Sequence, residues 1–229
     1  MIELERIRHS VAPHGLALRG GFHSAKEDAV PALAGDRVCR TVLLIGNLGG
    51  TMWACFSRSP EYADGGAHPL DRWTRRILEA AAESVAAFAL FPFGGPPWLP
   101  FQRWALKAGE VSVSPLGILI HPDFGLWHAY RGALAFAEDL DLPKPHRQAS
   151  PCDSCANRPC LSACPVGAFQ PAGYDVASCR DHVASARGES CRDGGCMARL
   201  ACPVGREHGY PKGQMAFHMA AFMPDRRKP

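Results

Sequence analysis

The clearest periodic pattern in the chain lies between residues 71 and 88. Apolar residues recur there at the three- and four-residue spacing of one helix face, namely Trp73, Ile77, Leu78, Ala81 and Val85. Asp71 precedes this pattern and is a residue type that accepts hydrogen bonds from the first N–H groups of a helix. The segment therefore predicts an amphipathic helix that begins at an Asp71 cap.

Shorter runs of apolar and β-branched residues predict strands. Residues 38–45 form such a run and end at a glycine-rich turn, which indicates a buried strand. Three further segments, 89–92, 116–121 and 130–136, predict strands, and short helices are expected at 100–107 and 212–222. Strands that alternate with helices predict an α+β fold, built as an α/β sandwich.

A proline-rich stretch from Pro143 to Pro151 divides the chain into two parts of different composition. Residues before it contain only Cys39 and Cys55, whereas the other eight of the ten cysteines follow it. Proline holds the preceding residue in an extended conformation, as is typical of linkers. We therefore expect two units, residues 1–145 and 146–229.

The overall composition is that of a globular protein and argues against nucleic acid binding and a membrane span. The chain has 229 residues, 47% of them hydrophobic and 21% charged, which is typical of globular domains. The formal net charge of +3 is small, so no nucleic acid partner is expected. The first residues lack the apolar core of a signal peptide, and no apolar run reaches the length of about eighteen that suggests a membrane span. We expect a cytoplasmic protein without a membrane partner.

The cysteines follow a spacing typical of iron-sulfur proteins. The first run reads C-x2-C-x4-C-x3-C-P. A second run downstream has the reverse order, with a lone cysteine first and a cysteine before proline last. The candidate ligands are Cys152, Cys155, Cys160, Cys164, Cys179, Cys191, Cys196 and Cys202. A 4Fe-4S cluster takes four thiolates, and in two-cluster ferredoxins the cysteine before proline ligates the other cluster. We therefore expect Cys152, Cys155 and Cys160 to share one cluster with Cys202. Cys164 would join Cys179, Cys191 and Cys196 at the second.

Two other uses of these cysteines remain open. Asn157 and Arg158 form a two-residue insertion relative to the usual bacterial spacing, and paired cysteines also bind zinc. Zinc ribbons usually carry two CxxC pairs, and only one occurs in this chain. A disulfide framework is the third alternative, although it is typical of small exported domains. Cys39 and Cys55 are expected to be buried thiols.

Three segments upstream of the cysteines contain candidate site residues. The turn after the strand at 38–45 includes Gly49 and Gly50, which would let the backbone approach a bound group. The stiff apolar segment 91–101, with Phe93 and Gly94, could form a wall or lid over a ligand. A plain tight turn and ordinary loop packing are equally good interpretations of these two segments.

The third segment, residues 121–131, concentrates polar and aromatic groups. His121, Trp127, His128 and Tyr130 occur there within ten residues. A neutral imidazole could ligate a metal or donate a hydrogen bond, whereas a structural role is the more common one for a single histidine.

The order of these motifs resembles epoxyqueuosine reductase. The resemblance rests on Ser114 to Trp127, the first cysteine run with the following Val-Gly-Ala-Phe, and Asp175-x3-Cys179. It extends to reductive dehalogenases and, through Gly117 to Arg131, to the cobalamin-processing CblC proteins. It implies a nitroreductase-like, cobalamin-binding domain followed by a ferredoxin-like module with two 4Fe-4S clusters.

The resemblance also implies roles for particular residues. Leu116, Gly117, His121 and Trp127 would lie against a corrin-sized or flavin-sized ring, and a cluster would supply it with electrons. The family's acidic proton donor has no matching residue here, and Asp71 lies nearest to its place. The helical repeats that follow in the queuosine enzyme are also missing, so we expect a small-molecule substrate rather than tRNA.

These observations predict an oxidoreductase in which two 4Fe-4S clusters pass electrons to a cofactor in the first unit and a small molecule is reduced. The resemblance implies that this cofactor is a corrinoid. Asp71, Asp123, His121, His128 and Tyr130 are the candidate proton donors, and an electron donor of the ferredoxin or flavodoxin type is the expected partner. The alternative is an electron-transfer protein without an organic cofactor. This alternative does not account for the first unit, because a ferredoxin alone needs far fewer residues than the chain contains.

Overall fold

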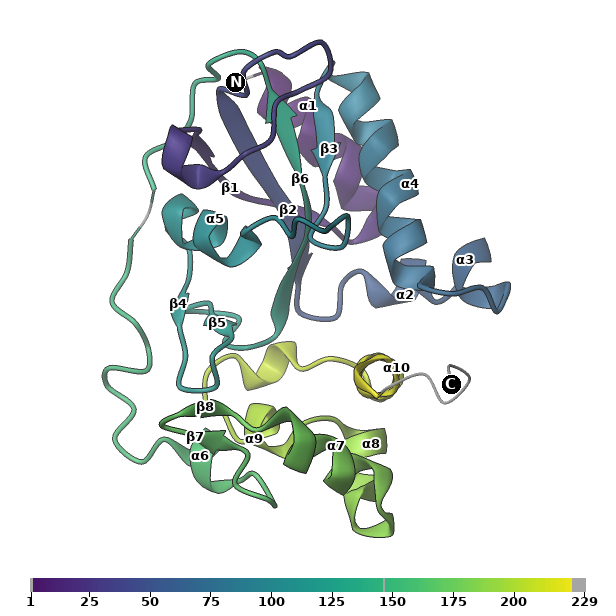
Figure 1. The fold of residues 1–229 in the computed structure, drawn as a ribbon, viewed down its shortest axis with the longest axis vertical. Coiled ribbons are helices and arrows are strands. Elements are labelled where there is room, and N and C mark those ends of the chain that lie inside the picture. The colour runs from purple at the N-terminus through teal and green to yellow at the C-terminus, as the bar shows by residue number, and fades with distance from the viewer. Residues whose placement is uncertain (1, 146, 224–229) are drawn as a thin grey trace. The chain divides into compact units, whose positions relative to one another are not determined.

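The computed structural model describes residues 2–145 and 147–223 (Figure 1). The chain forms two compact units. One contains the residues up to Val111 together with His128–Gln148, and the other contains Ser112–Trp127 together with the residues from Ala149 onward. His146, in the predicted linker, lies outside the described residues.

The first unit is built on a four-stranded antiparallel sheet. Its order is β1-β2-β6-β3, from β1 (Ala17–His23), β2 (Thr41–Leu48), β3 (Phe88–Leu90) and β6 (His128–Phe136). The β2 side chains are buried from Thr41 to Asn47, as the apolar run predicts for a central strand. A bulge interrupts the pairing at Gly46, where an added Cβ would lie 2.0 Å from the Ala129 carbonyl oxygen.

Helices complete the first unit. They are α1 (Ile2–Val11), α2 (Trp53–Phe56), α3 (Pro60–Ala63), α4 (Pro69–Ser84) and α5 (Phe101–Ala108), with 3-10 turns η1 (Ala12–His14) and η2 (Lys26–Asp28). Helix α4 packs on α1, β3 and β6, and α5 packs on β1. The buried Trp73 of α4 and Trp104 of α5 supply much of the apolar surface that these helices bury.

The predicted helix at 71–88 exists, but its start and end differ from the prediction. His68 is the N-cap residue, its side chain makes no capping hydrogen bond, and Asp71 lies inside the first turn. Pro69 explains the earlier start, because a residue without an N–H group suits the first helical position. The helix ends at Ser84, and the chain then turns into β3.

The predicted strand at 116–121 is mostly a turn. Only Leu119–Ile120 (β5) is extended, and it pairs with Ser112–Val113 (β4). Pro115 and Gly117, which has a φ of 74°, form the connecting turn and end the extended conformation. The strands expected at 38–45 and 130–136 and the helices expected at 100–107 and 212–222 are confirmed to within three residues.

The second unit consists of short elements around the cysteines. They are α6 (Pro159–Ser162), the hairpin β7 (Phe169–Gln170) and β8 (Gly173–Tyr174), α7 (Val176–Ala184), η3 (Ala186–Gly188), α8 (Glu189–Gly194), α9 (Met197–Leu200), η4 (Arg206–His208) and α10 (Lys212–Phe222). Helix α10 packs on α8. The protein is thus a mixed α and β structure with antiparallel sheets, in agreement with the predicted α+β class.

The division between the units differs from the predicted boundary at 145/146. Leu116, Ile120 and Leu126 form a buried cluster with Cys160 and Cys202, so the segment 112–127 packs with the cysteine-rich unit. An added Cβ at Gly125 would lie 2.0 Å from the Val204 carbonyl oxygen. This segment leaves the first unit because its apolar side chains are buried among the cysteines.

Candidate metal centres

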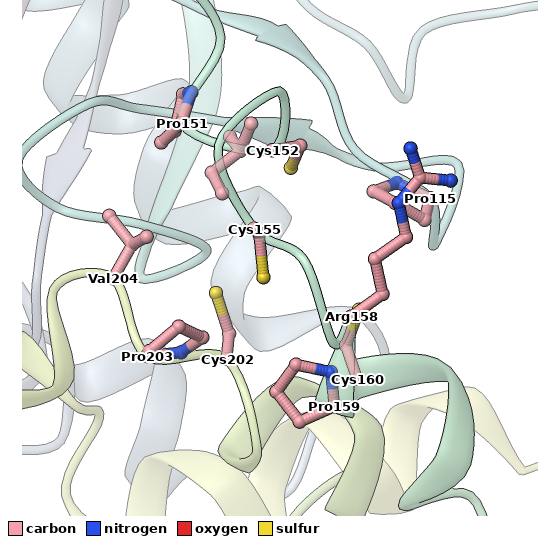
Figure 2. A pocket seen from close by; sticks show the side chains of 11 residues that line it. Pro115, Pro151, Cys152, Cys155, Arg158, Pro159, Cys160, Cys202, Pro203 and Val204 are labelled. Carbon is pink, nitrogen blue, oxygen red and sulfur yellow. The ribbon is translucent and has the colours of Figure 1, made fainter.

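The first group of cysteines surrounds a small cavity. Cys152, Cys155, Cys160 and Cys202 line it together with Pro115, Pro151, Pro159 and Pro203, and its volume is about 20 Å³ (Figure 2). The sulfurs of Cys155 and Cys202 point toward one another in Figure 2, although 47 positions separate them in the sequence. The cavity therefore joins the first cysteine run to the second.

Local structure places these four thiols. Cys152 and Cys155 lie in the turn before α6, and Cys160 lies within this helix, which begins at Pro159. Arg158 has a φ of 35°, an uncommon conformation for a residue with a side chain, and it belongs to the two-residue insertion that the sequence shows. The insertion thus forms the bend that leads into α6, and its arginine lines the cavity.

The second group of cysteines surrounds a larger cavity, of about 270 Å³. Cys164, Cys179, Cys191 and Cys196 line it, together with Ile118, Val166, Phe169, Tyr174, His182, Met197, Arg199, Met219 and Phe222 among others. Cys179 lies on α7, whose first turn is capped by the Asp175 side chain, which accepts the Ser178 N–H. Cys191 lies on α8, and Cys196 immediately precedes α9.

Burial changes the acidity of these thiols. It is the largest cause of the raised pKa of Cys152, Cys160, Cys191 and Cys196, and neighbouring cysteines of the same group raise each pKa further. Four such thiols would repel one another as thiolates, whereas bound metal cations hold cysteine sulfurs deprotonated. The arrangement is the one expected of sites that bind a positively charged centre.

The grouping in the structure is the same as the predicted partition, although metal binding itself stays a prediction. All ten cysteines are described, and none of them forms a disulfide in this structure. Within the described parts of the chain, no three His, Cys, Asp or Glu side chains converge as ligands of a single metal ion. The quartets instead surround cavities.

Asp71 and Tyr130, two candidate proton donors, belong to the first unit. Burial raises the pKa of Asp71, and the cations Arg131, His68 and Arg75 partly oppose this change. Burial also raises the pKa of Tyr130 to about 12, although the nearby Arg19 lowers it somewhat. His128 is buried in the same unit, with its ring 5.9 Å from that of Tyr130.

Arg19 is a site candidate that the sequence did not reveal. It is 1% exposed, its Nη1 donates to the Asn47 carbonyl oxygen at 3.3 Å, and its Cζ lies 4.9 Å from the centre of the Tyr130 ring. Among the described residues, neither Arg19 Nη2 nor the Tyr130 hydroxyl has a hydrogen-bond partner. Arginine is rarely buried, so its position in the strand sequence Ala-Leu-Arg-Gly-Gly gave no signal.

The predicted cofactor residues are divided between the two units. In the first, Gly49 has a φ of 58° and its carbonyl oxygen accepts the Asn47 side-chain amide, so it and Gly50 form a turn after β2. Phe93 stacks on Phe91 with ring centres 5.1 Å apart, and Gly94 follows it. All four positions lie in loops of the first unit, where Gly49 is buried, Gly50 and Phe93 are half-buried and Gly94 is exposed.

The remaining predicted cofactor residues belong to the cysteine-rich unit. Leu116 is buried beside Cys160 and Cys202, and Trp127 is buried against Tyr210 and the Arg199 guanidinium. The His121 Nδ1 accepts the backbone N–H groups of Asp123 and Phe124, which fixes this turn. Gly117 lies at the tip of the β4–β5 turn, with open space where an added Cβ would lie.

The described part of the chain contains no helix that is long and apolar enough to cross a membrane.

Comparisons with known proteins identify a fold relationship. No protein-family model and no curated protein sequence matches the chain. The structure of epoxyqueuosine reductase from Streptococcus thermophilus is similar, with 16% identity, 92% coverage of this chain, 68% coverage of that chain and a TM-score of 0.55. A structure of epoxyqueuosine reductase with a tRNA-Tyr stem loop is also similar. Its sequence identity is 16%, the match covers 92% of this chain and 67% of that chain, and the TM-score is 0.52.

A third similar structure is the Caenorhabditis elegans B12-trafficking protein CblC, with 15% identity, 100% coverage of both chains and a TM-score of 0.49. The fold likeness therefore rests on the epoxyqueuosine reductases. It confirms the fold relationship that the motifs suggested.

Proposed function

We propose that this protein is an iron-sulfur oxidoreductase in which two 4Fe-4S clusters pass electrons to a corrinoid held by the first unit, which then reduces a small molecule. The observation that carries the proposal is the pair of cysteine quartets, each around its own cavity. Each quartet supplies the four thiolates that a cubane requires. The clusters would supply one-electron transfer.

The order of the ligands supports two clusters rather than two independent zinc sites. Three members of each quartet come from one half of the cysteine-rich sequence, and the fourth is the cysteine before proline of the other half, Cys202 or Cys164. Two-cluster ferredoxins exchange their fourth ligands in this way. Each centre would therefore hold both halves of the unit together.

Two buried polar atoms without hydrogen-bond partners among the described residues support an organic cofactor in the first unit. Arg19 Nη2 and the Tyr130 hydroxyl are buried donors without a partner among the described residues. A buried donor without an acceptor is unfavourable by about 1–3 kcal/mol, so such groups usually face a ligand or water. A corrinoid carries amide oxygens that could accept these hydrogen bonds, and when bound it supplies cobalt redox chemistry.

The turn at Gly49 and Gly50 and the loop at Phe93 and Gly94 are the proposed contacts in the first unit. Leu116, Gly117, His121 and Trp127 remain proposed contacts from the family resemblance. Leu116 and Trp127 are buried within the cysteine-rich unit, so the structure fixes their side chains there.

Asp71 is the proposed proton donor of the reaction. Burial raises the pKa of its carboxyl group, and a raised pKa keeps a carboxylic acid protonated closer to neutral pH. His121, His128 and Tyr130 are the other proposed donors. The raised pKa of Tyr130, about 12, means that its hydroxyl keeps its proton throughout the physiological range.

The proposed partners are a ferredoxin-type or flavodoxin-type electron donor and a small-molecule substrate. One structural neighbour was solved with a tRNA stem loop, so RNA is a second candidate substrate. The formal net charge of +3 favours the small molecule, because nucleic acid affinity depends on many phosphate contacts. Salt-sensitive binding of a tRNA stem loop in a gel-shift assay would favour RNA instead.

Cobalamin titration of the anaerobically prepared, brown protein tests the proposal. We expect added cob(II)alamin to bind at micromolar concentration with a changed absorption spectrum, and chemically reduced clusters to reduce it further within the complex. Iron-loaded protein that leaves the cobalamin spectrum unchanged would support the alternative, an electron-transfer protein without an organic cofactor. Stoichiometric zinc with no iron would reject both.

A further inference from the structure

His182 lies beside the second cysteine quartet but is not one of its proposed ligands. It follows Cys179 by three residues on α7, so the two side chains share one face of this helix. Both line the second cavity. The His182 Nε2 is buried and has no hydrogen-bond partner among the described residues. A buried nitrogen without a partner is unfavourable, so such an atom usually faces a ligand or water.

Backbone contacts hold the histidine in this place. Its carbonyl oxygen accepts the N–H group and the hydroxyl of Ser185, at 3.0 and 2.7 Å. An added Cβ at Gly188 would lie 2.0 Å from the same oxygen, so the turn after α7 packs tightly against it. The next residue, Val183, is buried, and its carbonyl oxygen accepts Arg192 Nη1 at 2.9 Å. The imidazole therefore extends from a backbone that cannot shift easily.

The histidine also belongs to the wall between the second cavity and the surface. An open hollow on the surface is lined by exposed residues that include Asp181, Ser185 and Arg187. Among the described residues, only His182 and Val166 line both this hollow and the second cavity. Because valine is apolar, the imidazole supplies the polar group of the shared wall.

A cluster in the second cavity would offer acceptors to the buried nitrogen. Cluster sulfides and cysteine thiolates carry no proton, so they can only accept hydrogen bonds. They would favour the imidazole tautomer that carries its proton on Nε2. A reduced cluster carries one more negative charge than an oxidised cluster. An N–H donor therefore stabilises the reduced form more than the oxidised form.

We propose that His182 serves the second centre by donating a hydrogen bond from Nε2 to a cluster sulfur and by closing the cavity toward the surface hollow. This inference rests on the proposed function, because it requires a cluster in the second quartet. The hydrogen bond raises the reduction potential of that cluster, and the ring limits the access of solvent and chelators to it.

Three substitutions separate the two roles. His182→Gln keeps an N–H donor, His182→Leu keeps much of the bulk without a donor, and His182→Ala removes both. Redox titration followed by electron paramagnetic resonance measures the first role. His182→Leu should decrease the equilibrium constant for reduction of one cluster about tenfold, the lower end of the range for a hydrogen bond to a charged group. His182→Gln should keep most of the wild-type potential, and the other cluster should be unchanged in both variants.

Iron release to a chelator measures the second role. His182→Ala should lose one cluster faster than wild type, whereas His182→Leu should lose it at the wild-type rate because leucine still fills the wall. His208→Leu is the control for both measurements, since His208 belongs to the same unit and lines neither cysteine cavity. It should change neither the potentials nor the rate.

Wild-type protein with isotopically labelled histidine nitrogen gives a test that does not depend on the stability of a variant. Pulsed electron paramagnetic resonance of the reduced protein should detect a weakly coupled histidine nitrogen at one cluster. This coupling should persist in His208→Leu and disappear in His182→Gln, whose new side chain carries no label.

Iron analysis separates the two levels of failure. Full iron content with no histidine coupling and with unmoved potentials would overturn the role of His182 and leave the proposed function standing. Wild-type protein that binds no iron would overturn both.

Discussion

Single side chains decide the chemistry of the cysteine-rich unit. The quartets could be predicted residue by residue, because the spacing of cysteines and the prolines after Cys164 and Cys202 are visible in the sequence. The side chains around the cysteines could not be predicted. Tyr174 lines the second cavity and the Ser150 hydroxyl accepts the Cys152 backbone N–H only because the hairpin and the turn fold as they do, and neither residue type is unusual at its position.

Replacing one cysteine of each quartet tests the ligand set. Cys160→Ala and Cys196→Ala should each remove one cluster and about half of the bound iron, because three thiolates hold a cubane poorly. Cys39→Ala is the matched control, since Cys39 is a buried thiol whose Sγ lies 3.5 Å from the Thr41 carbonyl oxygen. Iron and acid-labile sulfide per chain are the quantities to measure. Equal iron loss in the control would contradict the assignment.

Tyr130→Phe tests the proposed cofactor contact in the first unit. The substitution removes a buried hydroxyl without a described partner, so the free protein should keep or gain stability, whereas cobalamin affinity should fall about fivefold to tenfold. Tyr210→Phe is the control, because this buried tyrosine belongs to the cysteine-rich unit. Equal affinities of wild type and Tyr130→Phe in a spectral titration would remove the tyrosine from the cofactor site.

At the scale of elements, close backbone contacts fix the turn that precedes β6. Gly125 has a φ of 53° and an added Cβ would lie 2.0 Å from the Val204 carbonyl oxygen. Gly125→Ala should therefore destabilise the cysteine-rich unit by about 3 kcal/mol or more, because backbone must move. Thermal unfolding of the iron-loaded protein would measure the change.

Gly117→Ala is a matched control for this substitution. Gly117 has a similar positive φ of 74°, but open space surrounds it. Only the conformational penalty of about 1–2 kcal/mol is expected there. Similar stabilities of the two variants would show that the contact between Gly125 and Val204 is not tight.

The connection between α3 and α4 depends on an ion pair. The Glu61 carboxylate accepts two hydrogen bonds from Arg76, at 2.5 and 3.0 Å, and this lowers the pKa of Glu61 from 4.5 to about 2. The folded-state pKa is below the unfolded-state value, so the stabilisation is complete above about pH 4.5 and is lost as the pH falls toward 2. Its size should be about 1 kcal/mol after solvent screening.

Glu61→Gln should therefore lower the free energy of unfolding at pH 7, and the difference from wild type should shrink below pH 4.5. Glu79→Gln is the control, because Glu79 pairs with Arg75 only through one 3.4 Å contact on the exposed face of α4. Its effect should be below about 0.5 kcal/mol. Denaturant unfolding at several pH values checks both. If the difference in unfolding free energy between wild type and Glu61→Gln did not change with pH, the stabilising role of the Glu61–Arg76 ion pair would be contradicted.

The sequence predicts elements well where one periodicity dominates. The apolar stripe of α4 and the buried run of β2 are examples. It failed at β1, where Gly20, Gly21 and a buried Arg19 interrupt the alternation expected of a strand. It also assigned Asp71 as a cap, because residue preference alone does not show that Pro69 already begins the helix.

At the scale of the whole molecule, the division into units depends on contacts that are distant in sequence. The proline-rich stretch gave a visible boundary, yet the segment 112–127 packs with residues after Cys160. No local signal distinguishes its apolar residues from those of a strand in the first unit. The same long-range packing brings Cys202 to the first cysteine run. This grouping was predictable only from the ligand pattern of two-cluster ferredoxins.

The central claim is that the two cysteine quartets hold two iron-sulfur cubanes. Iron and acid-labile sulfide analysis of the anaerobically reconstituted wild-type protein tests it most directly. The account predicts about eight iron and eight sulfide ions per chain, from two clusters with four thiolates each. Protein that binds one or two zinc ions and no sulfide would contradict it.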